Sequence, residues 1–343
     1  MPALLFSLAI GCAAPSQERA TVLSPGPTPV LTPAPVGAPP LPPELEALKE
    51  ELRAHAQHLT HDLGERSVDR PWELADAADY VATEWERMGY TIERQGYDVG
   101  EVVAQNLEVS VSGSDLGRES IIVGAHYDSP KAGTGVDTAT GVAALLALSR
   151  ALHDVAPRRR LRFVAYALGE APHFKRESMG SLRHAREVAA KGDRVSLMIN
   201  LDSLGHFSDA RASQQGMTGI DVPLPTIGNF LLLLGSEAAE TSSRALSTSC
   251  ATEPTLELVA RSYREGDADP ALAADDWPYR QSGVPALLIS DTKTLRAGSA
   301  APRSPEVDWV RLTRFVSCLI AGLEGLADAA PAPGDPESGP ETD

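Results

Sequence analysis

Residues 121–144, IIVGAHYDSPKAGTGVDTATGVAA, constrain the fold more than any other stretch of the chain. An apolar, mainly β-branched run from Ile121 to Val123 ends at Gly124, and polar side chains follow at once, which is typical of a buried strand that delivers residues to a site. A glycine-rich turn then leads into apolar residues at helical spacing, beginning near Gly141. The pattern predicts strand, polar loop and helix, a unit of α/β folds in which functional groups lie at strand ends.

His126 and Asp128 are the first polar side chains after this strand. Two residues apart on an extended segment, they point the same way, so the imidazole can bind a metal while the carboxylate holds the ring. Asp137 would be a third contributor from the glycine-rich turn. Taken alone, the pattern is equally that of a hydrogen-bonded polar pair near a surface, so its context decides.

Two further apolar strands are predicted to end in acidic residues. Leu161–Leu168 is followed by Gly169 and Glu170, and Val195–Leu201 is followed by Asp202. A lone aspartate after a strand can simply cap a loop. Acids or imidazoles at three successive strand ends make that interpretation less attractive.

Charge and length bound the class of protein. The chain has 343 residues, 43% of them hydrophobic and 22% charged, enough for one large α/β domain with tails. The formal net charge of −17 argues against nucleic acid and anionic membrane surfaces as partners, because both need clustered lysine and arginine.

The ends of the chain differ in composition from its middle. Residues 1–12, MPALLFSLAIGC, resemble the end of a bacterial lipoprotein signal without its positive region, with Cys12 as a possible site of lipid attachment. A mis-assigned start and a simple secretory signal are the alternatives. We expect an exported, membrane-anchored protein of the periplasm or cell surface. Residues 13–43 predict an extended proline-rich linker, residues 44–328 the folded domain, and residues 329–343 a disordered acidic tail.

The other two cysteines, Cys250 and Cys318, lack the spacing of metal ligands. The total of three cysteines is odd, so they cannot all pair within the chain. We expect Cys250 and Cys318 to be buried thiols rather than a bridge.

The residues at the strand ends resemble the zinc exopeptidase family that contains bacterial leucyl aminopeptidase and aminopeptidase Y. GAHYDS followed by GVDTATG is similar to the family's GAHYDS and GADDNASG or GANDNASG. LGEAPHF, followed by MGS, is similar to N-E-E-P-P-x-F and M-G-S, and NLDSLG is similar to N-L-D-M-x-G. GVPALLISDT at 283–292 resembles the later strand G-x-P-A-L-x-x-T-D-T. The resemblance covers roughly residues 50–326.

The resemblance implies a pair of zinc ions, roughly 3.5 to 4 Å apart and bridged by one carboxylate. It gives Asp137 as the bridge, His126 and Asp202 as ligands of the first ion, and Glu170 with a late histidine as ligands of the second. That late histidine is missing, since all eight histidines fall at or before His206. A zinc site generally needs at least three protein ligands, so we expect one ion at most.

Gly169 is the second departure from the family pattern. It stands where the resemblance implies the glutamate that acts as general base, a role typically worth about 100- to 10,000-fold in rate. His173, Glu177 and Asp276 are the nearby candidates for a substitute. Glutaminyl cyclases share the fold, but the resemblance implies that they need the same glutamate and a late histidine, so both gaps argue against that activity as well.

Two functions follow from the resemblance. In the first, the chain is a non-catalytic or strongly weakened relative that keeps the fold for binding, as the resembling domain of the transferrin receptor does. In the second, it is an active aminopeptidase-like hydrolase with a modified site that binds the free amino end of a peptide. The two losses favour the first.

The alternation of strands and helices predicts an α/β fold, a mixed and mainly parallel sheet with helices on both faces and ligand loops at the carboxyl ends of the strands. The last helix is predicted over residues 308–326. The resemblance also implies a cis peptide between Asp137 and Thr138, and a trans bond would weaken the transfer of the bridging role to Asp137.

Overall fold

The computed structural model describes residues 39–131, 135–253, 255–263, 274–296 and 306–330. The predicted signal segment, most of the proline-rich linker and most of the acidic tail lie outside these ranges. The last residues of the linker are described and they pack, because Leu41 is buried and the Arg314 guanidinium donates to the carbonyl oxygens of Pro39 and Pro40. No helix within the described ranges combines the length and apolar character needed to cross a membrane.

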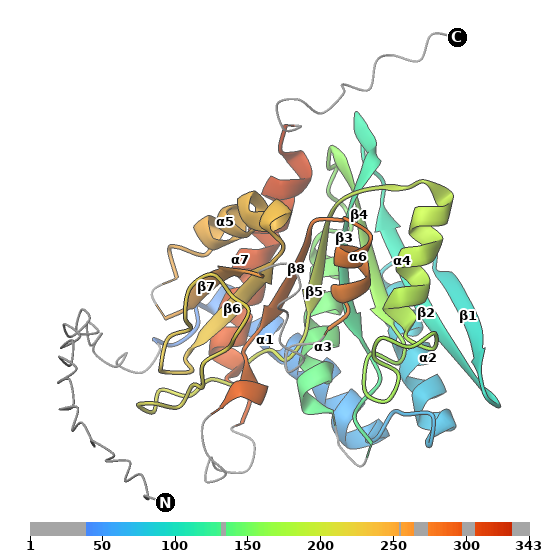
Figure 1. The fold of residues 1–343 in the computed structure, drawn as a ribbon, viewed down its shortest axis with the longest axis horizontal. Helices are drawn as coiled ribbons and strands as arrows, with labels where there is room; N and C mark the ends of the chain where they lie inside the picture. Colours follow the sequence, from blue (N-terminus) through green and yellow to red (C-terminus); the bar gives the residue numbers. More distant parts are fainter. Residues whose placement is uncertain (1–38, 132–134, 254, 264–273, 297–305, 331–343) are drawn as a thin grey trace, which may run out of the picture. The chain divides into compact units, whose positions relative to one another are not determined.

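Eight strands form one mixed sheet in the order β1-β2-β4-β3-β5-β8-β6-β7 (Figure 1). The strands are β1 Glu93–Val99, β2 Val102–Val111, β3 Leu116–His126, β4 Arg159–Tyr166, β5 Arg194–Leu201, β6 Phe230–Gly235, β7 Glu257–Ser262 and β8 Ala286–Ser290. The central strands β4, β3, β5 and β8 run parallel to their neighbours in this group, whereas β1, β2 and β6 introduce antiparallel pairs. The predicted α/β class with a mixed sheet is therefore confirmed.

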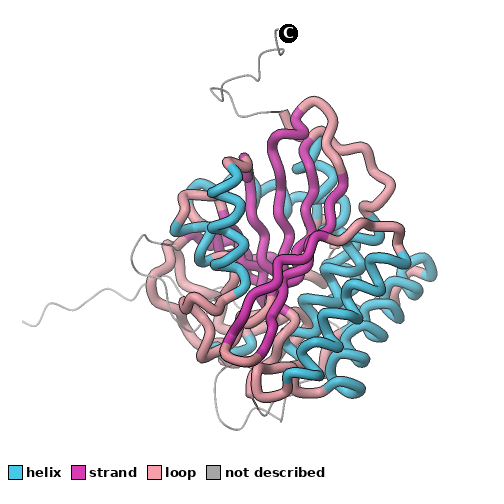
Figure 2. The backbone as a smooth tube through the Cα atoms, turned by 90° about the vertical axis from the view of Figure 1, so that its right-hand side faces the viewer, coloured by secondary structure: helices cyan, strands magenta, loops and turns pink. Residues whose placement is uncertain are grey.

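Helices cover both faces of the sheet (Figure 2). They are α1 Pro43–Gln57, a π-helical turn His58–Leu63, α2 Pro71–Arg87, α3 Val136–Ala151, α4 Gly180–Lys191, α5 Glu240–Ser249, α6 Trp277–Gln281 and α7 Trp309–Asp328, with short 3-10 turns at Glu237–Ala239 and Lys293–Leu295. Residues of α1, α2, α3 and α7 pack together in the large core, and α4 and α6 pack on the opposite face. The central helix α3 is apolar nearly all round, as expected for a helix enclosed on every side.

Alternating strand residues explain the two cores. Val123 and Phe163 belong to the large core, whereas their neighbours Ile122 and Val164 belong to the core under α4. Because successive side chains of a strand point to opposite faces, strands buried on both faces must be continuously apolar. This is the pattern from which β3, β4 and β5 are predictable.

Cys250 and Cys318 form a disulfide, with their Cα atoms 5.1 Å apart, so the expectation of two free thiols is wrong. Cys250 caps the C-terminal end of α5 and Cys318 lies inside α7, and these two helices pack against each other. Neither helix position is visible in the cysteine spacing, which spans 68 residues. The bridge joins the α5 edge of the domain to its C-terminal helix.

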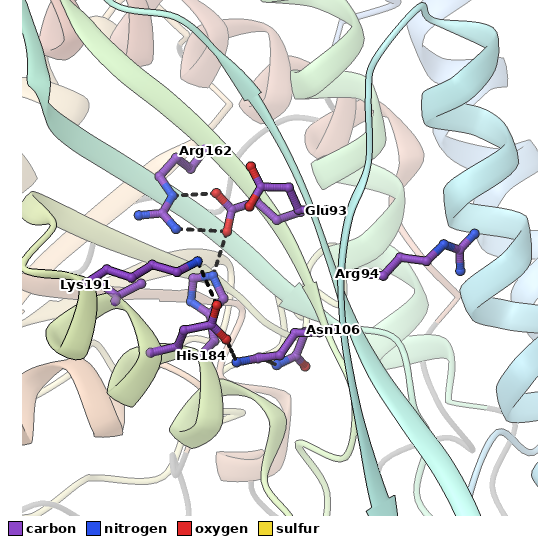
Figure 3. A pocket seen from close by; sticks show the side chains of 10 residues that line it. Glu93, Arg94, Asn106, Arg162, His184 and Lys191 are labelled. Atoms are coloured by element: carbon purple, nitrogen blue, oxygen red, sulfur yellow. Dashed lines mark hydrogen bonds and ion pairs between the residues drawn. The ribbon is translucent and has the colours of Figure 1, made fainter.

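A buried ionic cluster lies under α4, in the pocket drawn in Figure 3. The Arg162 guanidinium on β4 donates to both carboxylate oxygens of Glu108 on β2, and His184 Nε2 of α4 lies 2.7 Å from Glu108 Oε2. Burial alone would raise the pKa of Glu108, but the hydrogen bonds from His184 and Arg162 outweigh it and lower the pKa to about 2. These ion pairs tie the hairpin, the sheet and α4 together.

The Glu108 cluster predicts acid sensitivity. A carboxyl whose pKa falls from 4.5 to about 2 on folding stabilises the protein above pH 4.5, and this stabilisation disappears as the pH drops towards 2. We expect Glu108→Gln to lose about 2–3 kcal/mol of the free energy of unfolding at pH 7 and to flatten its decline between pH 4.5 and 2.5. Urea unfolding across this range measures both. Glu93→Gln, which alters an exposed carboxylate of the same pocket, is the control and should retain the wild-type profile.

Candidate active site

The predicted site residues come from adjacent strand ends. His126 ends β3, Glu170 follows β4 and Asp202 follows β5, and these strands are parallel neighbours in the order β4-β3-β5. Parallel neighbours end at the same edge of a sheet, so three loops far apart in the sequence meet there. β8, beside β5, adds a fourth strand end with Asp291.

Asp128 holds the first two of these loops together. Its Oδ1 lies 3.0 Å from His126 Nδ1 and accepts the Gly169 N–H at 2.8 Å, and its Oδ2 accepts the Glu170 N–H at 3.2 Å. Burial alone would raise the pKa of this carboxyl. The His126 imidazole and the two backbone donors lower it by a larger amount, so the net shift is downward. A charged Asp128 keeps the proton on His126 Nδ1 and leaves Nε2 to face the site.

Arg66 supports the same region, although its role is not predictable from the sequence. This fully buried guanidinium donates to the carbonyl oxygens of Leu59, Gly64, Tyr127 and Gly135 and to Thr138 Oγ1. It joins the π-helical turn, the loop after β3 and the start of α3. Asp137 lies in that first turn of α3, so its backbone position depends on Arg66.

His126 and Asp202 form one pair of candidate metal ligands. His126 Nε2 lies 3.7 Å from Asp202 Oδ1. Burial would lower the pKa of His126, but the charges of Asp128 and Asp202 raise it well above its usual value. Two donors on one tetrahedral zinc ion stand about 3.4 Å apart, so this separation suits a shared ion.

Asp137 and His206 form a second pair. His206 Nε2 lies 3.6 Å from Asp137 Oδ1 and has no hydrogen-bond partner among the described residues. The sequence suggested that no imidazole would reach the second half of the site, because no histidine follows position 206. The structure corrects this: the loop after β5, which carries Asp202, turns back and brings His206 to Asp137.

A lysine meets the same carboxylate. Lys293 Nζ forms an ion pair with Asp137 Oδ1. Asp291, buried at the end of β8, orients both partners of Asp137, because its Oδ2 accepts the His206 N–H at 2.6 Å and lies 3.2 Å from His206 Nδ1, while its Oδ1 accepts the Lys293 N–H at 2.8 Å.

Glu170 experiences the charges of both pairs. Burial, together with the negative charges of Asp128, Asp202 and Asp137, raises the pKa of Glu170 to about 7 although His126 opposes the shift. A bound cation would oppose this shift, because it favours the charged form of Glu170.

Gly169 is packed against the ring of His126. A Cβ added at Gly169 would stand 2.6 Å from His126 Cγ and 2.9 Å from both Cβ and Cδ2. The space next to this backbone is therefore filled by the imidazole, and a glutamate at position 169 requires His126 to move.

The three candidate substitutes for a base at position 169 are engaged elsewhere. Asp276 forms an ion pair with Arg280 at 2.6 Å, Glu177 is exposed and paired with Arg186, and His173 Nδ1 lies 2.9 Å from Ser178 Oγ.

Asp275, to which the sequence assigns no role, is the more relevant acid. Its side chain is buried, and neither carboxylate oxygen has a hydrogen-bond partner among the described residues. Burial raises its pKa to about 6, although the charge of His126 and the nearby Ser181 hydroxyl oppose the shift.

The backbone at Asp137 differs from the expectation. The peptide between Asp137 and Thr138 is not cis, and within the described part of the chain the cis bond is Ala171–Pro172. Both residues lie in the first turn of α3, and helical geometry requires trans peptides. The expected cis peptide is therefore absent at Asp137, and this weakens the prediction that Asp137 bridges two metal ions.

The donors of the site fit zinc in type and in pairwise spacing. Imidazole and carboxylate are ordinary zinc ligands, and His206 Nε2 is a buried nitrogen that lacks a partner among the described residues. The described residues include no group of three such donors arranged as a ready metal cage. The site consists of two donor pairs, His126 with Asp202 and Asp137 with His206, and Glu170 interacts electrostatically with both.

The fold is that of a zinc-exopeptidase-like α/β domain. Residues 106–302 match Peptidase family M28, and the chain belongs to this family.

Several known proteins are similar to the chain. The uncharacterized protein YfbL of Escherichia coli (strain K12) is 28% identical over 260 residues, which cover 73% of this chain and 79% of that protein. Among solved structures, the LapA aminopeptidase of Legionella pneumophila superposes with a TM-score of 0.61 at 16% identity, covering 83% of this chain and 75% of that one. BSAP, a zinc aminopeptidase from Bacillus subtilis, superposes with a TM-score of 0.61 at 13% identity, covering 82% of this chain and 95% of that one. A glutaminyl cyclase of Macrostomum lignano superposes with a TM-score of 0.59 at 16% identity, covering 86% of this chain and 96% of that one. At these identities the structural matches establish the fold.

The close approach at Gly169 can be tested directly. We expect Gly169→Ala to displace the His126 ring and to cost about 1–3 kcal/mol of the free energy of unfolding, because the added methyl group overfills a packed contact. Gly96→Ala is the matched control, since nothing lies within 4 Å of its added Cβ. Urea unfolding of both variants compares the two positions. Equal stability of the two variants would show that the His126 ring does not exclude a side chain at 169.

Proposed function

We propose that this chain is an exported zinc aminopeptidase homologue that binds the free amino end of a peptide and hydrolyses it far more slowly than an active member of its family. The observation that carries the proposal is the packing of the His126 ring against Gly169. The position from which the family's glutamate would act offers no room for that side chain.

His126 and Asp202 are the residues that would hold the zinc ion, with Asp137 and Glu170 as further carboxylates. When bound, such an ion polarises a scissile carbonyl and lowers the pKa of water. With an ion bound, Asp128 would keep the remaining His126 proton on Nδ1 and leave Nε2 as the ligand atom beside Asp202.

Peptide binding draws on the charge of the site. The carboxylates of Asp128, Glu170 and Asp202 act together, and they favour a positively charged amino end of a peptide. With a pKa of about 7, Glu170 exchanges its proton near neutral pH. It lines a small hollow with Asp128 and His173, beside the first donor pair.

One observation favours the second candidate function, an active peptide hydrolase with a relocated base. Asp275 is buried near His126, its carboxylate oxygens have no hydrogen-bond partner among the described residues, and its pKa is raised to about 6. A carboxyl of this kind can accept a proton near neutral pH.

Turnover and metal content distinguish the two functions. We expect purified protein to bind no more than one zinc ion and to cleave aminoacyl anilides at least about 100-fold more slowly than an active family member assayed in parallel. His126→Ala should reduce the zinc content. Turnover within tenfold of the active member, abolished by His126→Ala, would overturn the proposal. Loss of that turnover in Asp275→Asn with unchanged zinc would assign the base to Asp275.

Export is supported by the Cys250–Cys318 bridge, because structural disulfides persist in oxidising compartments and are rare in the cytosol. Cys12 lies outside the described residues, and lipid attachment there stays a prediction. Protein isolated from its own cells, with free thiols blocked at lysis, should show Cys250 and Cys318 unmodified by the blocking reagent in mass spectra. Alkylated Cys250 and Cys318 would contradict export.

A further inference from the structure

The contact of Lys293 with Asp137 places a fixed positive charge inside the candidate site. Lys293 begins the 3-10 turn after β8, and its side chain is 19% exposed. Its backbone N–H is anchored on the buried Asp291, so the ammonium reaches Asp137 from a fixed origin. The Asp137 side chain is 36% exposed, so solvent partly screens this ion pair, which joins two elements 156 residues apart.

His206 is a second neighbour of Asp137 Oδ1, the oxygen that Lys293 contacts, and its imidazole is a potential metal ligand. Asp291 Oδ2 accepts a hydrogen bond from the N–H group of His206 Nδ1. The other ring nitrogen, Nε2, therefore points away from Asp291. That nitrogen is buried, lacks a hydrogen-bond partner among the described residues, and lies 3.6 Å from Asp137 Oδ1. A nitrogen lone pair opposite a carboxylate oxygen at this separation suits a shared metal ion, since two donors of one tetrahedral zinc ion are about 3.4 Å apart.

We propose that Asp137 and His206, with Glu170 near them, form a second cation site in which the Lys293 ammonium takes the place of a metal ion. The inference rests on the proposed function for the first site, where His126 and Asp202 would hold zinc. The Lys293 ammonium is covalently attached to the chain and occupies Asp137, so it keeps a second metal ion from binding there. The protein is then limited to a single metal ion. Asp291 serves both arrangements because it orients His206 and anchors Lys293.

Removing the ammonium should open this second site. In Lys293→Met the long stem is kept while the charge is lost, so Asp137 and His206 are left without a cation and would supply, with Glu170, the three protein ligands that a zinc ion generally needs. We expect this variant to bind one metal ion more than the wild type. The double variant Lys293→Met/His206→Ala should lose that additional ion, because Asp137 is then left without its imidazole partner.

Metal stoichiometry tests the proposal without reference to activity. Metal-free protein is dialysed against Zn²⁺, and separately against Co²⁺, and the ions bound per chain are measured by mass spectrometry; Co²⁺ absorption reports coordination by nitrogen and oxygen. Lys131→Met removes an exposed lysine that pairs with Asp69, and as the matched control it should leave the stoichiometry at the wild-type value. Thermal unfolding of each variant confirms that it is folded.

The outcomes separate this inference from the proposed function. A gain of one ion in Lys293→Met that is lost in the double variant supports the inference, whatever the wild type binds. Wild-type protein that binds no ion, together with such a gain, rejects the His126–Asp202 site and retains the second site. An unchanged stoichiometry in Lys293→Met, or a gain that survives His206→Ala, overturns the inference.

Discussion

The hydrogen bonds of the Asp128 carboxylate hold the part of the site that contains His126 and Glu170. A single buried side chain accepts the Gly169 and Glu170 N–H groups and pairs with the ring of His126, so two loops share one anchor. A buried carboxylate is tolerated only when its charge is compensated, and here each of its donors is also part of the site. The position of Glu170 and the orientation of His126 are consequently linked. Arg66 extends this link to the first turn of α3, which carries Asp137.

The second half of the site is organised by another buried carboxylate, Asp291. It fixes His206 and the Lys293 backbone from the end of β8, while the Arg296 guanidinium donates to the Asp291 and His206 carbonyl oxygens. The departures from the family pattern are therefore not simple deletions. Where a glutamate side chain is missing, an imidazole packs against glycine, and where a late histidine is missing, an earlier histidine and a lysine reach Asp137.

Much of the central fold is predictable because burial on both faces leaves a clear mark in the sequence. The continuous apolar runs of β3, β4 and β5 end where polar residues begin, and this locates His126, Glu170 and Asp202. The second half of the sheet has weaker signals in the sequence, and β6, β7 and the helix α5 that follows β6 are not predicted from it. The sequence predicts short strands over residues 90–93 and 106–111 for the first hairpin, whereas β1 covers Glu93–Val99 and β2 covers Val102–Val111.

The residues that complete the site were harder to find for a different reason. Lys293 and Asp137 are separated by 156 residues, and nothing in either local sequence indicates that they meet. His206 had one available signal, since it lies four residues after Asp202 in the same loop, but counting histidines by their order in the chain directed attention to the missing one. Arg66 and Asp291 act through buried backbone groups, and such partners are visible only once the fold is known.

The bridge between α5 and α7 has a consequence for how the chain responds to cutting. It closes a covalent ring over residues 250–318, which contains β7, α6, β8 and Lys293. A protease that cleaves one peptide bond within this ring would not separate the two products unless a reductant were present. After a cut between Cys250 and Asp291, the polypeptide that carries Asp291 and Lys293 would therefore stay attached to the polypeptide that carries Asp137 and His206.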